Sequence, residues 1–195
     1  MTASEKEPKI ALTIAGSDPS GGAGIQADIK TFTVMGVYGA SILTSLTAQN
    51  TLGVTETYNL PPFFIEQQAK TLASDIRVSA VKTGMLGNAE TVQTIIDILK
   101  TYSFGPLVVD PVLQSTSGDK LLTLSGLDVM RNQLLPLAFL VTPNLFEASQ
   151  LLGKTMARSL TEMENQAHDL LKLGIRAVLL KGGHLEHQGK AVDIL

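Results

Sequence analysis

Six apolar segments of strand length in this sequence each end in a polar or glycine-rich cluster. The clusters are 15–24 (AGSDPSGGAG), 48–51 (AQNT), 82–85 (KTGM), 110–112 (DPV), 142–144 (TPN) and 181–183 (KGG). In an open parallel sheet the carboxyl ends of the strands share one edge, and ligands bind in the crevice there. The pattern therefore predicts that polar groups far apart in the sequence meet at one site.

The first cluster places Gly21, Gly22 and Gly24 directly before a predicted helix. Glycines at a helix start let a ligand reach backbone N–H groups and the positive end of the helix dipole. A plain type I turn over 18–21 is the structural alternative. The sequence spacing from Gly16 to Gly21 is that of a P-loop, but Gly22 and Ala23 stand where that loop needs Lys and then Ser or Thr. The cluster is therefore predicted to bind a ligand without being a Walker A loop.

Several other residues have both a functional and a structural interpretation. The segment 22–27 matches the dinucleotide-binding fingerprint, yet Gln49 stands where that fingerprint needs an acid, so this remains a minor alternative. Asp28 points back toward its helix start, where it can contact a ligand or compensate the helix dipole. Asn144 and Glu147 have the spacing of a capping box. His184 and His187 are interpreted as loop residues rather than metal ligands.

The elements that must position these residues alternate regularly along the chain. Strands are predicted at 9–15, 41–48, 78–82, 107–110, 139–142 and 177–180, with an edge strand or flap at 53–60 and a strand-like end at 190–195. Helices are predicted at 25–35, 61–74, 88–100 with Asn88 as N-cap, 125–135, 143–152 and 161–173 with Thr161 as N-cap. This alternation favours a three-layer αβα fold with a mostly parallel sheet covered on both faces.

Composition narrows the function classes. The 195 residues have a formal net charge of -3 and no cysteine, which argues against nucleic acid as a partner and excludes disulfides and thiolate metal sites. The longest apolar stretches, such as 134–141, are far shorter than the ~20 residues that cross a bilayer. The first nine residues lack the apolar core of a secretory signal. We expect a cytoplasmic protein with a disordered tail at 1–8 and one domain at 9–195.

Five ordered motifs carry a family resemblance. They are 15–28 (AGSDPSGGAGIQAD), 48–51 (AQNT), 82–86 (KTGML), 142–147 (TPNLFE) and 181–184 (KGGH). From about residue 9 to the last residue, the chain resembles the hydroxymethylpyrimidine/phosphomethylpyrimidine kinases of thiamine biosynthesis. That family belongs to the ribokinase-like superfamily, which also includes pyridoxal kinases. The resemblance implies ATP-dependent phosphorylation of 4-amino-5-hydroxymethyl-2-methylpyrimidine and of its monophosphate.

The resemblance also implies roles for particular residues. The aminopyrimidine would be held by Gly16, Asp28 and Gln49, with Ala23, Met85 and Val112 against its ring. Asp110 and Glu147 would lie near Mg²⁺, Asn144 and Lys181 near the ATP phosphates, and Lys181 would stabilise charge during transfer. Carboxylates suit a hard cation, and a lysine suits developing negative charge on phosphoryl oxygens.

The family pattern departs from this sequence at its end. Ribokinase-like kinases have a later Gly-x-Gly-Asp/Cys segment that forms an anion hole and supplies the general base, and residues 1–195 contain no such segment. The fold is therefore expected to be C-terminally incomplete, and the chain to be poorly active, poorly soluble or self-associating. A noncatalytic pyrimidine-binding protein and a pyridoxal-type kinase remain alternatives. Relatives form dimers, but nothing in the residues specifies an interface.

Overall fold

The computed structural model describes residues 8–115, 118–183 and 191–195. Strands and helices alternate in it as the sequence predicts. The elements are β1 (Ile10–Ser17), α1 (Gly24–Val34), β2 (Tyr38–Asn50), β3 (Gly53–Asn59), α2 (Pro62–Ala73), β4 (Ala80–Thr83), α3 (Ala89–Thr101), β5 (Leu107–Val109), α4 (Leu124–Val129), η1 (Met130–Leu134), η2 (Leu135–Leu137), β6 (Leu140–Val141), α5 (Leu145–Leu152), α6 (Leu160–Leu171) and β7 (Ala177–Val178).

The seven strands form one sheet in the order β3-β2-β1-β4-β5-β6-β7. All neighbours pair in parallel except β2 and β3, which form an antiparallel hairpin at one edge. The chain leaves β1 toward β2 on one side, and the later strands add on the other side of β1. This reversal lies between β1 and β4, which is where open α/β sheets form their ligand crevice. The predicted three-layer α/β class is confirmed.

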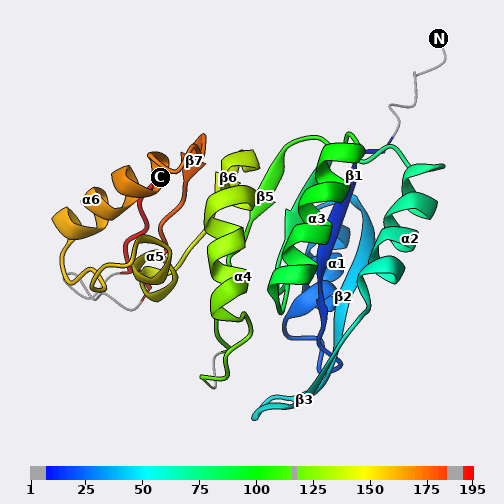
Figure 1. Cartoon of the computed structure of the whole chain (residues 1–195), viewed down its shortest axis with the longest axis horizontal. Helices are drawn as coiled ribbons and strands as arrows, with labels where there is room; N and C mark the ends of the chain where they lie inside the picture. The colour runs from blue at the N-terminus through cyan, green and yellow to red at the C-terminus, as the bar shows by residue number, and fades with distance from the viewer. Residues whose placement is uncertain (1–7, 116–117, 184–190) are drawn as a thin grey trace.

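The two faces of the sheet are covered differently. Thr13, Lys82, Val108 and Leu140 are register partners on successive strands, so their side chains share one face, and α1 lies on that face over β1 and β2. The neighbouring row from Ile14 through Val109 and Val141 points the other way and is fully buried. Figure 1 shows α3 and α4 in front of the sheet and α1 behind it. The α1 face therefore holds polar groups close to the crevice.

Local sequence predicts some helix boundaries correctly and others wrongly. Asn88 caps α3 as predicted, because its side chain accepts a hydrogen bond from the N–H of Thr91. Thr161 as the cap of α6 is wrong, since the Ser159 hydroxyl accepts from the N–H of Glu162 and starts that helix two residues earlier. Prediction of one helix over 125–135 is also wrong, because α4 gives way to a π turn and then to a 3₁₀ turn at η2.

The end of the chain is less regular than predicted. Ile194 forms one antiparallel bridge with Leu180, and the two residues exchange backbone hydrogen bonds of 2.8 and 3.0 Å. Within 191–195, the described part of the strand expected at 190–195, this bridge is the only strand pairing. His184 and His187 lie outside the described residues. Among the described helices, none is both long enough and apolar enough to cross a bilayer.

Candidate active site

A cavity of about 290 Å³ opens at the carboxyl edge of the sheet, beside the reversal between β1 and β4. Its lining includes seven residues to which the sequence assigns a site role: Gly16, Ala23, Asp28, Gln49, Met85, Asp110 and Val112. They come from β1, α1, β2 and the segments that follow β4 and β5. The fold therefore brings together residues that are up to about a hundred positions apart in the sequence.

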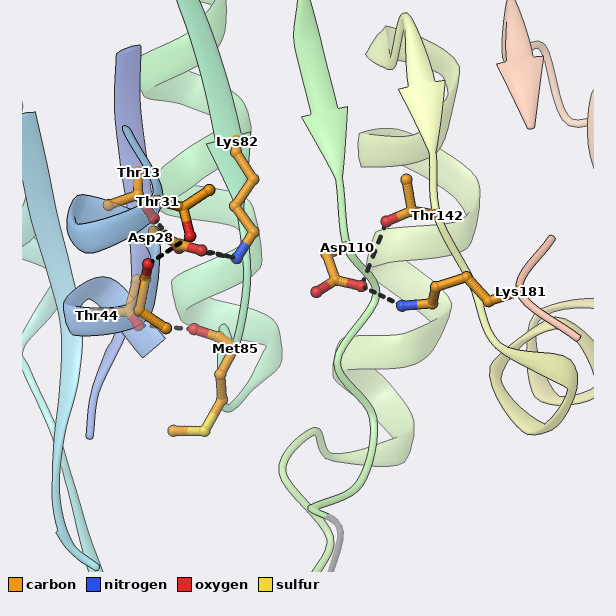
Figure 2. Close-up of polar contacts among 10 residues, drawn as sticks. Thr13, Asp28, Thr31, Thr44, Lys82, Met85, Asp110, Thr142 and Lys181 are labelled. Carbon is orange, nitrogen blue, oxygen red and sulfur yellow. Dashed lines mark hydrogen bonds and ion pairs between the residues drawn. The ribbon is translucent and has the colours of Figure 1, made fainter. Parts of the chain in front are cut away.

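Asp28 is held from two strands at once. Thr13 of β1 donates its hydroxyl to Asp28 Oδ2 at 2.6 Å, and Lys82 Nζ of β4 lies 2.8 Å from Oδ2 and 3.1 Å from Oδ1. The side chains of Asp28 and Lys82 are 18% and 24% exposed, so the ion pair is largely shielded from water. Figure 2 shows the three side chains converging between α1 and the sheet.

Gln49 lies near the end of β2, next to an irregularity in its pairing with β3. The hydroxyl of Thr47 contacts Gln49 Oε1 at 3.2 Å and the carbonyl of Ser17 at 2.8 Å. Among the described residues, Gln49 Nε2 has no hydrogen-bond acceptor. A side-chain amide in this state keeps a donor for a ligand in the cavity.

The wall of the cavity depends on close packing at Gly16. A Cβ atom there would lie 2.7 Å from the Ser45 hydroxyl and 3.1 Å from Met85 Cε, so a larger residue would displace both neighbours. Met85 is itself held by its backbone, because its carbonyl accepts from the hydroxyl of Thr44 at 2.8 Å. These contacts fix the apolar wall next to Asp28.

The glycine-rich loop is organised by an acid of its own. Asp18 accepts hydrogen bonds from the backbone N–H groups of Ser20, Gly22 and Ala23 at 2.8–3.1 Å and from the Ser20 hydroxyl. Burial alone would raise the pKa of Asp18, but these donors outweigh it and lower the pKa below its ordinary value. The N–H groups of Gly22 and Ala23 are therefore occupied by a carboxylate and are not open to a ligand, contrary to the sequence prediction.

Packing also explains one of the loop glycines. Gly24 has a φ of +58°, and a Cβ on it would lie 2.4 Å from the carbonyl oxygen of Gly16. A turn is present at 18–21 as predicted, since the N–H of Gly21 donates to the Asp18 carbonyl at 2.9 Å. The turn in this cluster is confirmed, while Ala23 and Gly24 line the cavity and their contact with a ligand stays a prediction.

A second acid–lysine pair lies on the β5–β7 side of the cavity. Thr142 donates its hydroxyl to Asp110 Oδ1 at 3.3 Å, and Lys181 Nζ contacts the same oxygen at 3.2 Å. Asp110 lines the cavity. Lys181 does not line the cavity and is connected to it only through its ion pair with Asp110. Figure 2 shows the two pairs facing each other across the end of the sheet.

Asn144 and Glu147 form the capping box that their spacing indicates. The N–H of Glu147 donates to Asn144 Oδ1 and the N–H of Asn144 donates to Glu147 Oε2, both at 2.8 Å. A parallel bridge between Asn144 and Lys181 brings the start of α5 beside the second pair. Neither Asn144 nor Glu147 lines the cavity.

Glu147 is in an unfavourable place for a negative charge. Burial raises the pKa of Glu147, and the nearby Asp110 charge raises it further, against the lowering effects of the Asn144 N–H, the Lys181 ammonium and the Leu113 N–H. A cation between the two acids would relieve this repulsion. Within the described part of the chain, no cluster of three or more potential metal-binding side chains occurs. Two carboxylates nevertheless suit Mg²⁺, which commonly takes its other ligands from water and substrate phosphates.

A family model described as phosphomethylpyrimidine kinase matches residues 18–195, nearly the whole domain that holds this cavity. The chain belongs to the phosphomethylpyrimidine kinase family. The hydroxymethylpyrimidine/phosphomethylpyrimidine kinase of Escherichia coli K12 is 47% identical over 178 residues, which are 91% of this chain and 67% of that protein. The Rhizobium meliloti kinase of the same name is 48% identical over 185 residues, 95% of this chain and 69% of the relative.

Solved structures agree with this assignment. The crystal structure of a phosphomethylpyrimidine kinase from Clostridium difficile 630 is 44% identical, with a TM-score of 0.87, and the match covers 95% of this chain and 79% of that one. A pyridoxal kinase from Staphylococcus aureus in complex with ADP is 38% identical, with a TM-score of 0.86 and coverage of 96% and 68%. The ribokinase-like fold is therefore confirmed. The chain spans about two thirds of the length of the bacterial hydroxymethylpyrimidine/phosphomethylpyrimidine kinases that it matches.

The sequence analysis assigned no role in the site to Lys82, Thr13 or Asp18. Lys82 belongs to the predicted strand-end cluster 82–85, which was a usable signal, but its partner could not be read from the sequence. For Asp18, the sequence Asp-Pro-Ser-Gly is itself the signal, because aspartate favours hydrogen bonds to backbone groups a few residues ahead. Thr13 is one of several alternating strand residues, and nothing distinguishes it before α1 is placed.

Proposed function

We propose that this chain phosphorylates the hydroxymethyl group of 4-amino-5-hydroxymethyl-2-methylpyrimidine, and then the monophosphate, with ATP as the donor. The observation that supports this most directly is the single cavity lined by Asp28 and Gln49 on one side and by Asp110 on the other. Its volume, about 290 Å³, is at the small end of ligand pockets and suits a single substituted ring. The family and its curated relatives support the same reaction class.

The pyrimidine occupies the side formed by β1, β2 and α1 in this proposal. Asp28 accepts from the exocyclic amine, and Gln49 offers both a donor and an acceptor to the ring edge. Met85, Val112 and Ala23 enclose the ring with apolar surface. The hydroxymethyl group then points toward Asp110, which is the cavity residue nearest to Lys181 in the hydrogen-bond network.

The phosphates occupy the side formed by β5, β6 and β7. Asp110 and Glu147 would hold Mg²⁺, and the cation would supply neutralisation of the negative charge on the phosphates. Lys181 stabilises negative charge on the transferring phosphoryl oxygens, and Asn144 places the start of α5 beside them. Phosphoryl transfer depends mostly on such positioning and charge neutralisation. Homodimer formation and a cytoplasmic location stay predictions.

The direct test is a transfer assay. Purified chain is incubated with ATP, Mg²⁺ and the pyrimidine alcohol, and product is followed by mass spectrometry, with the Escherichia coli relative as the positive control. We expect the monophosphate and then the diphosphate. No product under conditions in which the relative works would defeat the proposal. Calorimetric binding of the pyrimidine without turnover would instead support the noncatalytic alternative.

A pyridoxal-type kinase is the second candidate, and one observation favours it. The Staphylococcus aureus pyridoxal kinase solved with AMP-PCP and pyridoxal has a TM-score of 0.86 and 37% identity over 96% of this chain. Gln49→Ala separates the two functions. It removes the amide that fits an aminopyrimidine edge, so the pyrimidine should lose more affinity than pyridoxal does. Equal losses for both substrates would favour a site without this preference.

A further inference from the structure

Lys82 is the one lysine that the structure places in the lining of the cavity among the described residues. We propose that Lys82 is a positioning residue that fixes Asp28 and makes the site selective for an uncharged ring carrying an amine donor. This assignment rests on the proposed function and deepens it. Neither the strand-end pattern nor the family resemblance assigned Lys82 a role.

Hydrogen bonds leave Asp28 with limited accepting capacity. A carboxylate offers about four acceptor positions over its two oxygens. Oδ2 already accepts from the Thr13 hydroxyl at 2.6 Å and from Lys82 at 2.8 Å, while Oδ1 has only the longer 3.1 Å contact with Lys82. Oδ1 is therefore the oxygen that can accept a short bond from a ligand.

Three elements hold this geometry in place. Thr13 and Lys82 are register partners on β1 and β4, so both approach Asp28 from the same face of the sheet, and Asp28 approaches from α1. Gly84 gives the ammonium group room, since a Cβ there would lie 3.1 Å from Lys82 Nζ and 3.0 Å from Ala15 Cβ. The carboxylate is thus oriented before any ligand arrives, which reduces the entropy cost of binding.

The charge balance decides which ligands are preferred. An unpaired carboxylate in a shielded cavity would attract a protonated ring nitrogen or another cation. Lys82 compensates that charge, so the pair is formally neutral and a cationic ligand gains little from it. A neutral amine that donates one hydrogen bond to Oδ1 still gains a bond to a charged acceptor, which is stronger than one between neutral groups.

The test compares two ligands by calorimetric titration of the purified chain. One is 4-amino-5-hydroxymethyl-2-methylpyrimidine, and the other is the analogue without the 4-amino group. For Lys82→Met we expect an affinity loss of about 10- to 100-fold for the amine and less than about 3-fold for the analogue. Lys82→Arg keeps the cation and should stay within about 5-fold of the wild type for both. Lys154→Met, which breaks an exposed pair with Asp169, is the matched control and should change neither affinity.

A second set of variants guards against misfolding of Lys82→Met. Asp28→Asn removes the charge that needs Lys82, so the double variant Asp28→Asn/Lys82→Met should bind the amine as weakly as Asp28→Asn alone. Additive losses in this cycle, or equal losses for the two ligands in Lys82→Met, would overturn the assignment. A wild-type chain that binds neither ligand would overturn the proposed function as well, so the two failures are distinguishable.

Discussion

The two sides of the cavity are built from the same three residue types, held with different tightness. Asp28 accepts from a threonine and a lysine at 2.6 and 2.8 Å, whereas Asp110 accepts from a threonine and a lysine at 3.3 and 3.2 Å. The lysine is 24% exposed in the first trio and 41% exposed in the second. In the first trio both oxygens of the acid have a partner, whereas in the second trio both contacts end on Asp110 Oδ1 and Oδ2 has no hydrogen bond among the described residues.

Each side also contains a buried acid that is not part of its trio. Asp18 and Glu147 are 3% and 5% exposed, yet the pKa is lowered in Asp18 and raised in Glu147. For both, burial is the largest influence and raises the pKa. Asp18 has enough N–H and O–H donors to reverse that effect, while Glu147 lies close to the negative charge of Asp110. The difference agrees with the proposal that a neutral ring binds on the Asp28 side and a cation on the Asp110 side.

Lys181→Ala should have the largest effect, a fall in kcat. It should leave pyrimidine affinity unchanged and so show that the two sides of the cavity act separately. It removes the cation that would stabilise the transferring phosphoryl group, so we expect kcat to fall by about 100- to 1,000-fold. Pyrimidine affinity should stay near the wild-type value, because the Asp28 trio is untouched. Steady-state kinetics and calorimetry measure the two quantities. Lys172→Ala, at an exposed pair with Asp169, is the control. A Lys181 variant that loses pyrimidine affinity in parallel with kcat would show that the sides do not act separately.

Asp18→Asn should have an intermediate effect, on stability. The amide cannot accept from as many N–H groups as the carboxylate, so we expect a loss of about 1–3 kcal/mol in the free energy of unfolding at neutral pH. Because the pKa of Asp18 is lowered by folding, its contribution is present above the unfolded value of 3.8 and disappears as the pH falls through the lower folded value. Urea unfolding of wild type and variant at several pH values measures this. A constant difference at all acidic pH values would contradict it.

Sequence reasoning recovered the fold and the gathering of the site because both depend on repeated local patterns. Apolar strands followed by polar clusters predict a parallel sheet, and the shared strand edge predicts that Gln49 and Asp110 lie at one site. Asp28 was placed beside them by its tilt toward the start of its helix and by the family resemblance. The pairing of Lys82 with Asp28 depends instead on which residues of β1 and β4 are in register and on where α1 crosses them. Register and helix placement are properties of the assembled sheet. Asp28 and Lys82 are 54 residues apart in the chain, so local sequence does not reveal their contact.

Competition between local hydrogen bonds explains two of the errors. Glycines 21, 22 and 24 predict N–H groups available to a ligand, but the Asp18 side chain already accepts from three backbone N–H groups of this loop. Ser159 and Thr161 are both acceptable caps by residue type, and only Ser159 has the extended backbone that a cap needs. Such choices differ by about 1 kcal/mol, so packing decides them.

Glu147→Gln should have the smallest effect on stability. It should distinguish the role of Glu147 as a helix cap from its proposed role as a metal ligand. Gln keeps a side-chain acceptor for the Asn144 N–H, so the free energy of unfolding at neutral pH should stay within about 1 kcal/mol of the wild type or rise. The pKa of Glu147 is raised by folding, so its unfavourable effect is absent below the unfolded value of 4.5 and grows as the pH rises through the folded value. The free energy of unfolding of Glu147→Gln should therefore not contain this pH-dependent decrease.

Magnesium provides the decisive comparison for Glu147. In the wild type, Mg²⁺ together with a nonhydrolysable ATP analogue should raise the melting temperature more than the analogue alone, because a cation held by the folded state stabilises it. Glu147→Gln should remove most of that increment, and Glu162→Gln, at the exposed first turn of α6, should preserve it. If the Glu147 variant responds to Mg²⁺ as the wild type does, then Glu147 is a helix cap alone and the cation depends on Asp110 and the phosphates.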